Sequence, residues 1–196
     1  VSEVLVIGRN SLEMSHPKLK EIIHKDFSEF SSISSQIGGY DACYACMGVS
    51  VAGLSEKEYS RMTYDFTMAL AKELATLNSN MTFIYVSGQG TDSTENGRSM
   101  WARVKGKTEN HLIQLGFRQT FLFRPGGIIP LRGIKSKTKL YQFFYDYFMW
   151  LLKIIKLIAP KSIVNTTQIG QAMINASIKG YGRKIILPRD IIRLSE

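Results

Sequence analysis

Residues 81–90 read MTFIYVSGQG, an apolar, β-rich run that stops at a Ser-Gly-Gln-Gly turn. Such a run is typical of a buried strand, and the glycines after it let the chain turn sharply. Helical periodicity flanks it on both sides, over residues 54–78, where Ser55 and Glu58 have capping-box spacing, and over residues 98–116, which end at Gly116. A strand between two helices is the repeating unit of a parallel sheet with helices on its faces.

Further short apolar runs lie outward from this unit, at residues 4–8, 20–27, 40–48 and 117–127. Their alternation with helices predicts an α/β fold built on a doubly wound parallel sheet. A chain of 196 residues falls in the single-domain range, so we expect residues 1–196 to form one domain. Residues 131–180, which end in a helix closed by Gly180, are expected to form a small helical substrate lobe within it.

The chain is basic, with 25 Lys and Arg against 16 Asp and Glu and a formal net charge of +9. The basic residues are scattered and match no nucleic-acid-binding module, so we expect no nucleic-acid partner. A phosphate-bearing ligand fits this charge at least as well.

Two cysteines, Cys43 and Cys46, have the C-x-x-C spacing of metal and redox motifs. On a strand, residues three apart point to opposite faces, so the two thiols are not expected to hold one metal ion. We expect no metal site, buried free thiols and, because free thiols are typical of a reducing compartment, a cytoplasmic protein.

In a doubly wound sheet, ligands bind beyond the carboxyl ends of the strands. The residues just past each predicted strand are therefore binding candidates: Arg9, Asp26, Met47, Gly48, Ser87, Arg124, Pro125 and Gly126. Glycines there let a ligand approach the backbone, and arginines pair with phosphate. For any single glycine a plain turn remains the alternative.

Six segments in this order, VLVIGRN, HPKLKEIIHKDF, DACYACMG, FIYVSGQGTDS, WARVKGKTEN and FRPGGIIP, resemble the short-chain dehydrogenase/reductase superfamily. The similarity is to its atypical, epimerase/dehydratase-like branch that includes the Tat-interactive oxidoreductase-like proteins, and it implies a Rossmann-like fold. The family opens with a glycine-rich strand-turn-helix that is absent before VLVIGRN, and we expect the native protein to carry it upstream of Val1.

The resemblance implies that an NAD(P) cofactor lies across the strand ends. Arg9 would then take the place where an acidic residue usually holds the ribose of NAD, which favours the 2′-phosphate of NADP over NAD. Asp26 would lie beside the adenine, Met47 and Gly48 beside the ribose and pyrophosphate, and the segment 124–126 near the nicotinamide.

The family's catalytic tyrosine and lysine are four residues apart on one helix, where both face one pocket. Lys105 matches the lysine, but Trp101 stands at the tyrosine position and has no proton that titrates near neutral pH. Ser87 is the candidate for the accompanying hydroxyl, since Gly88 follows it.

Two functions follow. The first is an NADP-linked oxidoreductase or epimerase-like enzyme acting on a small carbonyl or hydroxyl substrate, with another acid in place of the tyrosine. The alternative is a non-catalytic NADP-binding or partner-binding module. The aromatic, amphipathic stretch 140–158 is predicted to pack on the substrate lobe, with a homodimer contact and a membrane-surface helix as the other interpretations.

Overall fold

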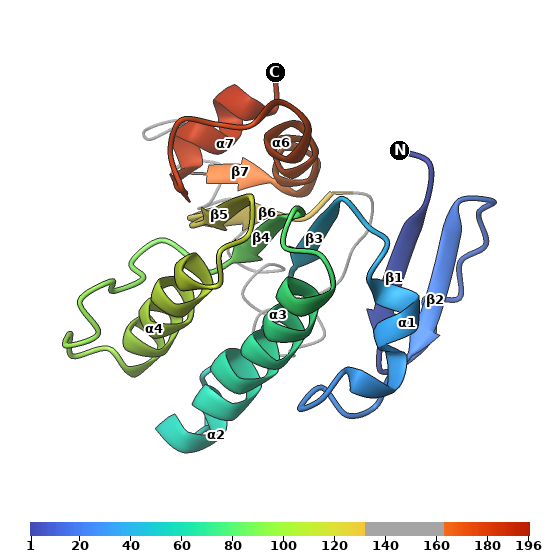
Figure 1. Ribbon diagram of the computed structural model, residues 1–196. Coiled ribbons are helices and arrows are strands. Elements are labelled where there is room, and N and C mark those ends of the chain that lie inside the picture. The colour runs from blue at the N-terminus through green and yellow to red at the C-terminus, as the bar shows by residue number, and fades with distance from the viewer. Residues whose placement is uncertain (132–162) are drawn as a thin grey trace.

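The computed structural model describes residues 1–131 and 163–196, and Figure 1 shows their arrangement. The strands are β1 Val4–Gly8, β2 Leu19–Ile23, β3 Ala42–Ala45, β4 Thr82–Val86, β5 Gln119–Phe123, β6 Gly127–Ile129, β7 Ile163–Asn165 and β8 Ile185–Ile186. The helices are α1 Ser34–Ile37, α2 Glu56–Ser60, α3 Phe66–Leu77, α4 Met100–Gln114, α6 Thr166–Lys179 and α7 Pro188–Leu194. A 3-10 turn, Ser31–Ile33, precedes α1, and a π-helical turn, Arg61–Asp65, joins α2 to α3.

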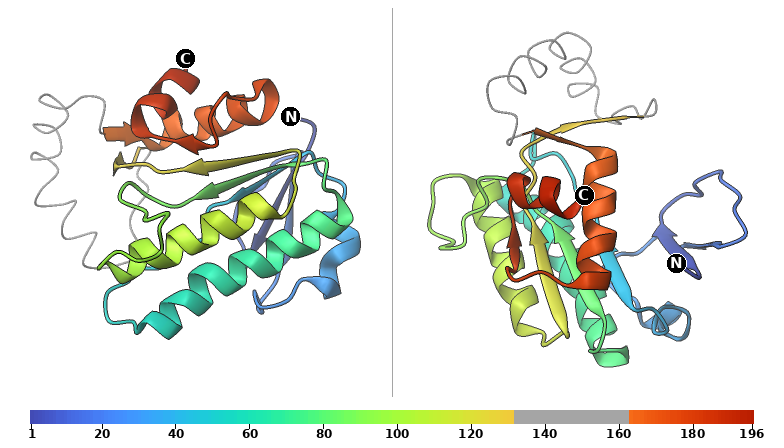
Figure 2. Two further views of the ribbon diagram at one scale, coloured as in Figure 1. Left: turned by 60° about the vertical axis from the view of Figure 1, so that its left-hand side comes forward. Right: turned by 90° about the horizontal axis from the view of Figure 1, so that it is seen from above.

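The main sheet has four parallel strands in the order β3-β4-β5-β8. Its side chains alternate between two cores, as the pleat of a strand requires. Phe83, Tyr85 and Leu122 pack in one cluster with α3 and α4, whereas Ile84 and Phe121 pack in another with α6 and α7. The fold therefore has three layers, with helices on both faces of the sheet (Figure 2). This confirms the predicted Rossmann-like α/β class.

The strands β1 and β2 form a separate parallel pair beside this sheet (Figure 1). No backbone pairing joins β1 to β3 within the described residues, and the gap lies where the family resemblance places the strand expected upstream of Val1. The side chains of Leu5, Ile7 and Ile22 pack against the core that lies under α3 and α4, and the Tyr40 hydroxyl donates to Glu3 Oε1 at 2.6 Å. The pair is thus attached to the main sheet by side-chain contacts and not by ladder hydrogen bonds.

The helix ends follow the sequence closely. The predicted capping box is present, because Ser55 Oγ accepts from the Glu58 N–H while the Glu58 carboxylate accepts from the Ser55 N–H at 2.9 Å. Gly116 follows α4 with φ of 75° and Gly180 follows α6 with φ of 73°, a backbone region that favours glycine.

The segment predicted as a substrate lobe is described only in part. Its helix α6 packs Ala172, Met173 and Ala176 against one face of the main sheet. The aromatic stretch 140–158 lies outside the described residues. Among the helices that are described, none is long and apolar enough to cross a membrane.

The two cysteines are free thiols. Cys43 lies within β3 and is half-buried, and burial raises its pKa to about 12. The expectation that both thiols are buried is wrong for Cys46, which is exposed because β3 ends one residue earlier, at Ala45. In the described part of the chain, no three His, Cys, Asp or Glu side chains are grouped so that they could hold a metal ion.

Candidate dinucleotide-binding site

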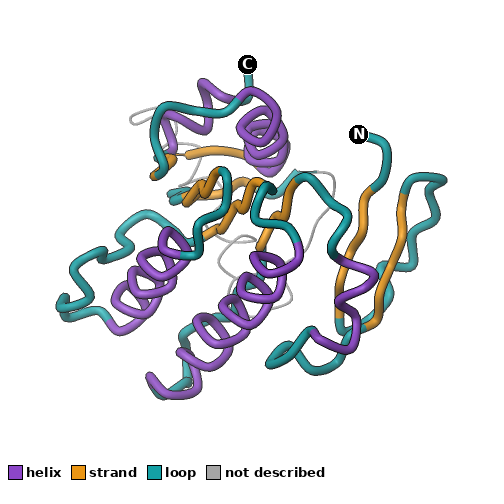
Figure 3. The backbone as a smooth tube through the Cα atoms, in the orientation of Figure 1, coloured by secondary structure: helices purple, strands orange, loops and turns teal. Residues whose placement is uncertain are grey.

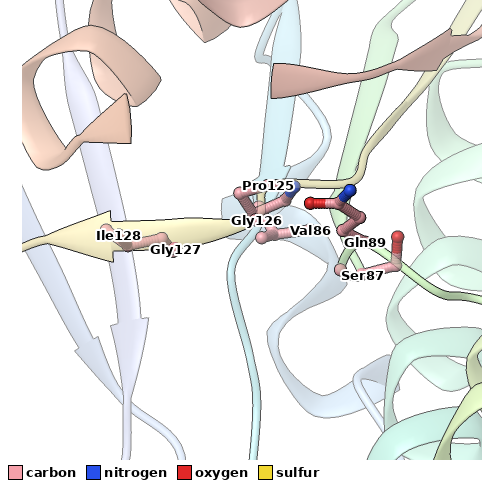
Figure 4. Close-up of a pocket in the computed structure, with 8 residues that line it drawn as sticks. Val86, Ser87, Gln89, Pro125, Gly126, Gly127 and Ile128 are labelled. Carbon is pink, nitrogen blue, oxygen red and sulfur yellow. The ribbon is translucent and has the colours of Figure 1, made fainter. Parts of the chain in front are cut away.

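A cavity of about 490 Å³ lies beyond the carboxyl ends of β4 and β5. It is lined by two short segments, Val86, Ser87, Gly88 and Gln89 after β4 and Pro125, Gly126, Gly127 and Ile128 after β5. Figure 4 shows the two segments facing each other, with the Gln89 side chain extended toward Pro125. The Gln89 N–H donates to the Pro125 carbonyl at 2.8 Å, which fixes the spacing of the two walls.

A buried ion pair lies behind the Ser87 wall. Glu109 of α4 is about 1% exposed and forms an ion pair with the Arg124 guanidinium, whose Nε lies 3.1 and 3.2 Å from the two carboxylate oxygens. The Ser87 hydroxyl donates to Glu109 Oε1 at 2.5 Å, and Arg124 Nη2 donates to Ser93 Oγ at 2.6 Å. The carboxylate of Glu109 thus links α4, the Ser87 turn and the end of β5.

Lys105 lies one helical turn before Glu109, so both face the Ser87 turn. Its ammonium group donates to the carbonyl of Ser87. Burial lowers the pKa of Lys105 to about 8, although the nearby Glu109 carboxylate acts in the opposite direction. A partly desolvated lysine of this kind is common at functional sites.

Trp101 lies on the same face of α4 as Lys105 and Glu109, and its side chain packs on the turn after Ser87. A Cβ placed on Gly90 would lie 3.3 Å from Cη2 of the indole ring, and one on Gly88 would lie 3.9 Å from Cζ3. Gly90 has φ of 92°. The two glycines therefore allow the turn both its backbone conformation and its close contact with the indole ring.

The loop between β4 and α4 runs out beside the helix, as the trace in Figure 3 shows. At Gly106 the helix and loop backbones touch, since a Cβ there would lie 1.7 Å from the carbonyl oxygen of Asp92. Asn110 Nδ2 donates to the Ser93 carbonyl at 3.0 Å, and Arg103 Nη1 donates to the Gly97 carbonyl at 2.7 Å. These contacts hold the loop, and hence the cavity wall, against α4.

The remaining predicted binding residues follow β1, β2 and β3. Arg9 is exposed, and its carbonyl accepts a hydrogen bond from the ammonium group of Lys25. Hydrogen bonds from the Ser28 hydroxyl and N–H lower the pKa of Asp26. Met47 is half-buried against the core, whereas Gly48 is exposed and has no atom within 4 Å of an added Cβ.

The structure thus brings one part of the predicted site together, namely Ser87, Trp101, Lys105 and the segment 124–126. It also shows that the Arg124 side chain is held by Glu109 and Ser93, so this guanidinium is already paired. Sequence reasoning missed Glu109. Its position four residues after Lys105 and eight after Trp101, on one helical face, was the available signal.

Solved structures with the same fold are nucleotide-sugar and short-chain dehydrogenase enzymes. WbmF of Bordetella bronchiseptica, solved in complex with NAD⁺, superposes with a TM-score of 0.65 at 11% identity, covering 99% of this chain and 68% of WbmF. A UDP-galactose 4-epimerase superposes with a TM-score of 0.61 at 13% identity, covering 93% of this chain and 66% of the enzyme. These similarities define the fold class as that of Rossmann-like epimerases and dehydrogenases.

Sequence similarity narrows this class. The chain is 27% identical over 132 residues to protein FMP52-2, mitochondrial, of Scheffersomyces stipitis, and 25% identical over 130 residues to protein HTATIP2 of Rattus norvegicus. The matches cover 66% and 65% of this chain but 56% and 52% of the relatives, so the chain spans about half their length. No family model matches the sequence. In sequence and fold together, the chain is similar to atypical, epimerase-like short-chain dehydrogenase/reductase proteins.

The expectation of a cytoplasmic location is wrong. The FMP52 relatives from Scheffersomyces stipitis, Candida albicans and Emericella nidulans are all named mitochondrial. Free cysteines do not distinguish the cytoplasm from mitochondria, because they indicate only that the surroundings are reducing.

Proposed function

We propose that this protein binds a nicotinamide dinucleotide across the carboxyl ends of its strands, with the nicotinamide end in the cavity beside Ser87 and Pro125. The observation that carries the proposal is the glycine-lined cavity, whose wall is held in place by Lys105 and the Glu109–Arg124 ion pair. The dinucleotide fits because backbone, without side chains, forms much of the cavity at Gly88, Gly126 and Gly127.

At the adenosine end of the dinucleotide, we propose that the protein binds NADP in preference to NAD. Arg9 is exposed, and its side chain makes no hydrogen bond or ion pair within the described part of the chain. Lys25 contacts the Arg9 backbone, so two cations are available for a 2′-phosphate. Gly48 leaves open space for the pyrophosphate. In this proposal Asp26 lies beside the adenine and Met47 beside the ribose.

The test is calorimetric titration of NADPH and NADH into the wild type, Arg9→Ala and Arg118→Ala. Arg118 is another exposed arginine, lies just before the amino end of β5 and so at the opposite end of the strands, and serves as the matched control. We expect NADPH to bind more tightly than NADH, and Arg9→Ala alone to remove the preference. Absence of binding by either dinucleotide to the chain and to a form extended upstream would refute the proposal.

The chemistry is a second step of the proposal. Trp101 takes the place of the tyrosine acid, and the Ser87 hydroxyl is held by Glu109, so the usual proton relay is not available. A bound nicotinamide would supply or accept a hydride. Lys105 is a titratable group next to Ser87. Its pKa of about 8 leaves part of the amine neutral near neutral pH. This favours a role for Lys105 in transferring a proton to or from a small carbonyl or hydroxyl substrate.

The alternative of a non-catalytic binding module is favoured by the internal pairing of Ser87 and Arg124. Trp101→Tyr separates the two functions. Turnover of simple carbonyl compounds gained by this variant, with dinucleotide binding unchanged, indicates a pocket that lacks only its acid. Unchanged binding without turnover supports the binding module.

We also infer a mitochondrial location, supported by the names of the FMP52 relatives. Fractionation of cells that express the tagged full-length protein tests this inference. Recovery of the protein outside the mitochondrial fraction would refute it. The homodimer stays a prediction, to be tested by light scattering.

A further inference from the structure

A second hollow, of about 410 Å³, is formed by residues of α7 and its flanking segments. Figure 1 shows α7 near the C-terminus of the chain. The lining of the hollow consists of Tyr181, Arg183, Arg189, Asp190, Ile192, Arg193 and Glu196. It shares no residue with the cavity beside Ser87. Three of its seven lining residues are arginines, and all three are exposed.

The three arginines of this hollow outnumber its two acidic residues, Asp190 and Glu196. Arg189 and Arg193 are four residues apart on α7, on one helical face, and neither side chain makes a hydrogen bond or ion pair with the residues that the structure describes. Arg183 has one acidic neighbour, Asp190, at 3.9 Å. Two guanidinium groups are therefore free to bind a ligand, and a third is weakly held.

Asp190 is buried and its carboxylate is oriented by two internal hydrogen bonds, so of the three arginines it pairs only with Arg183, at 3.9 Å. The Tyr181 hydroxyl donates to Oδ1 at 2.9 Å and the Leu187 N–H donates to Oδ2 at 3.1 Å. Burial and the Asp190 carboxylate raise the pKa of Tyr181, while Arg193 and Arg183 lower it. With three guanidinium groups and two carboxylates in its lining, the hollow carries a net positive formal charge.

We propose that this hollow is a binding site for a phosphate group, with Arg189 and Arg193 as its principal ligands and Arg183 and Tyr181 at its edge. A guanidinium group presents its N–H donors in a planar fork that matches phosphate oxygens, and two such groups suit a doubly charged phosphomonoester. The ring of Tyr181 and the side chain of Ile192 supply an apolar wall for the organic part of the ligand. The same chemistry serves a soluble phosphomonoester and a phosphatidic acid headgroup.

The experiment compares the double variant Arg189→Gln/Arg193→Gln with Lys57→Gln/Lys72→Gln. Each removes two positive charges from exposed side chains, the second pair lying on α2 and α3. One arm titrates inorganic phosphate and phenyl phosphate by calorimetry at low ionic strength. The other arm measures co-sedimentation with phosphatidylcholine vesicles with and without phosphatidic acid.

We expect the arginine variant to bind phenyl phosphate at least about tenfold more weakly than the wild type, and the lysine variant to bind within about twofold. Binding only to vesicles that contain phosphatidic acid, with the same dependence on the arginines, assigns the site to a lipid headgroup. No binding in either arm, or an equal loss in both variants, overturns the proposal. Circular dichroism of both variants confirms that they fold.

Discussion

Removal of the Arg124 guanidinium tests how far the site depends on its buried ion pair. Arg124→Leu removes the cation paired with the Glu109 carboxylate, which is about 1% exposed in the wild type, and leaves the Ser87 hydroxyl and Lys105 among its described polar neighbours. Breaking a buried pair by removing one partner costs about 3–5 kcal/mol. For a chain of this size we therefore expect a fall in Tm of roughly 6–20 °C.

The assay is urea and thermal denaturation of a double-mutant cycle. The single variants are Arg124→Leu and Glu109→Leu, and the double variant carries both. Because the double variant leaves no unpaired charge in the core, we expect it to be more stable than Arg124→Leu alone. Arg118→Leu, at an exposed arginine that donates one 3.4 Å hydrogen bond to Thr82, is the control and should change stability by less than about 0.5 kcal/mol.

Two results would refute this reasoning. A loss below about 1 kcal/mol in Arg124→Leu would place the pair in the class of solvent-screened surface bridges. A double variant no more stable than Arg124→Leu would mean that the arginine contributes through packing and not through the charge of Glu109. Either outcome would remove the support that we give the ion pair in holding the cavity wall.

Three further predictions concern single residues. Gly106→Ala should destabilise the fold by about 1–3 kcal/mol or more, because the added Cβ would lie 1.7 Å from the Asp92 carbonyl oxygen. Gly170→Ala, where α6 leaves open space, should instead stabilise it by about 0.5–1 kcal/mol. Urea denaturation of both variants measures the two free energies of unfolding, and equal effects would contradict the prediction. Folding lowers the pKa of Lys105 to about 8 from 10.5, so between these pH values the unfolded state binds more protons than the folded state. The stability of the wild type relative to Lys105→Met should therefore rise with pH in this range, by up to about 1.4 kcal/mol per pH unit. A stability difference that stays constant from pH 7 to about 10.5 would count against the shift. Cys46 is exposed as a residue, but the protein atoms around its thiol partly desolvate it and raise its pKa. Alkylation at neutral pH should therefore be slower than for a free thiol, and rapid labelling detected by mass spectrometry would disprove this.

Much of the fold was predictable because it is set by nearby residues. The capping box at Ser55, the glycine ends of α4 and α6 and the strands β1 to β5 follow from short-range patterns and are present, whereas β6 and β7 were not predicted. The spacing of Trp101 and Lys105 also fixed their shared face correctly, since helical geometry alone decides it. The separation of β1 and β2 from the main sheet agrees with the expectation that a further strand lies upstream of Val1, because the gap falls where the family resemblance places that strand.

The candidate site was predictable only in outline. Strand ends and glycines located the cavity beside Ser87, but the partner of each side chain was not deducible. Arg124 was assigned to a ligand, and the structure pairs it with Glu109, fifteen residues away in sequence. An arginine and a buried glutamate are recognised as a pair only when the fold brings the end of β5 onto α4.

In the chain of residues 1–196, β1 and β2 are attached to the main sheet by side-chain contacts without ladder hydrogen bonds, and this has a consequence for cooperativity. Apolar contacts between two hydrogen-bonded units give each unit its own free energy of local opening, and the two-stranded unit, with fewer ladder bonds, is the weaker. Amide protons of Val4–Gly8 then exchange with solvent through a partial opening that leaves β4 and β5 intact. A dinucleotide that contacts both Arg9 and the Ser87 turn would bridge the two units, and its binding free energy would appear as slower exchange in the N-terminal one.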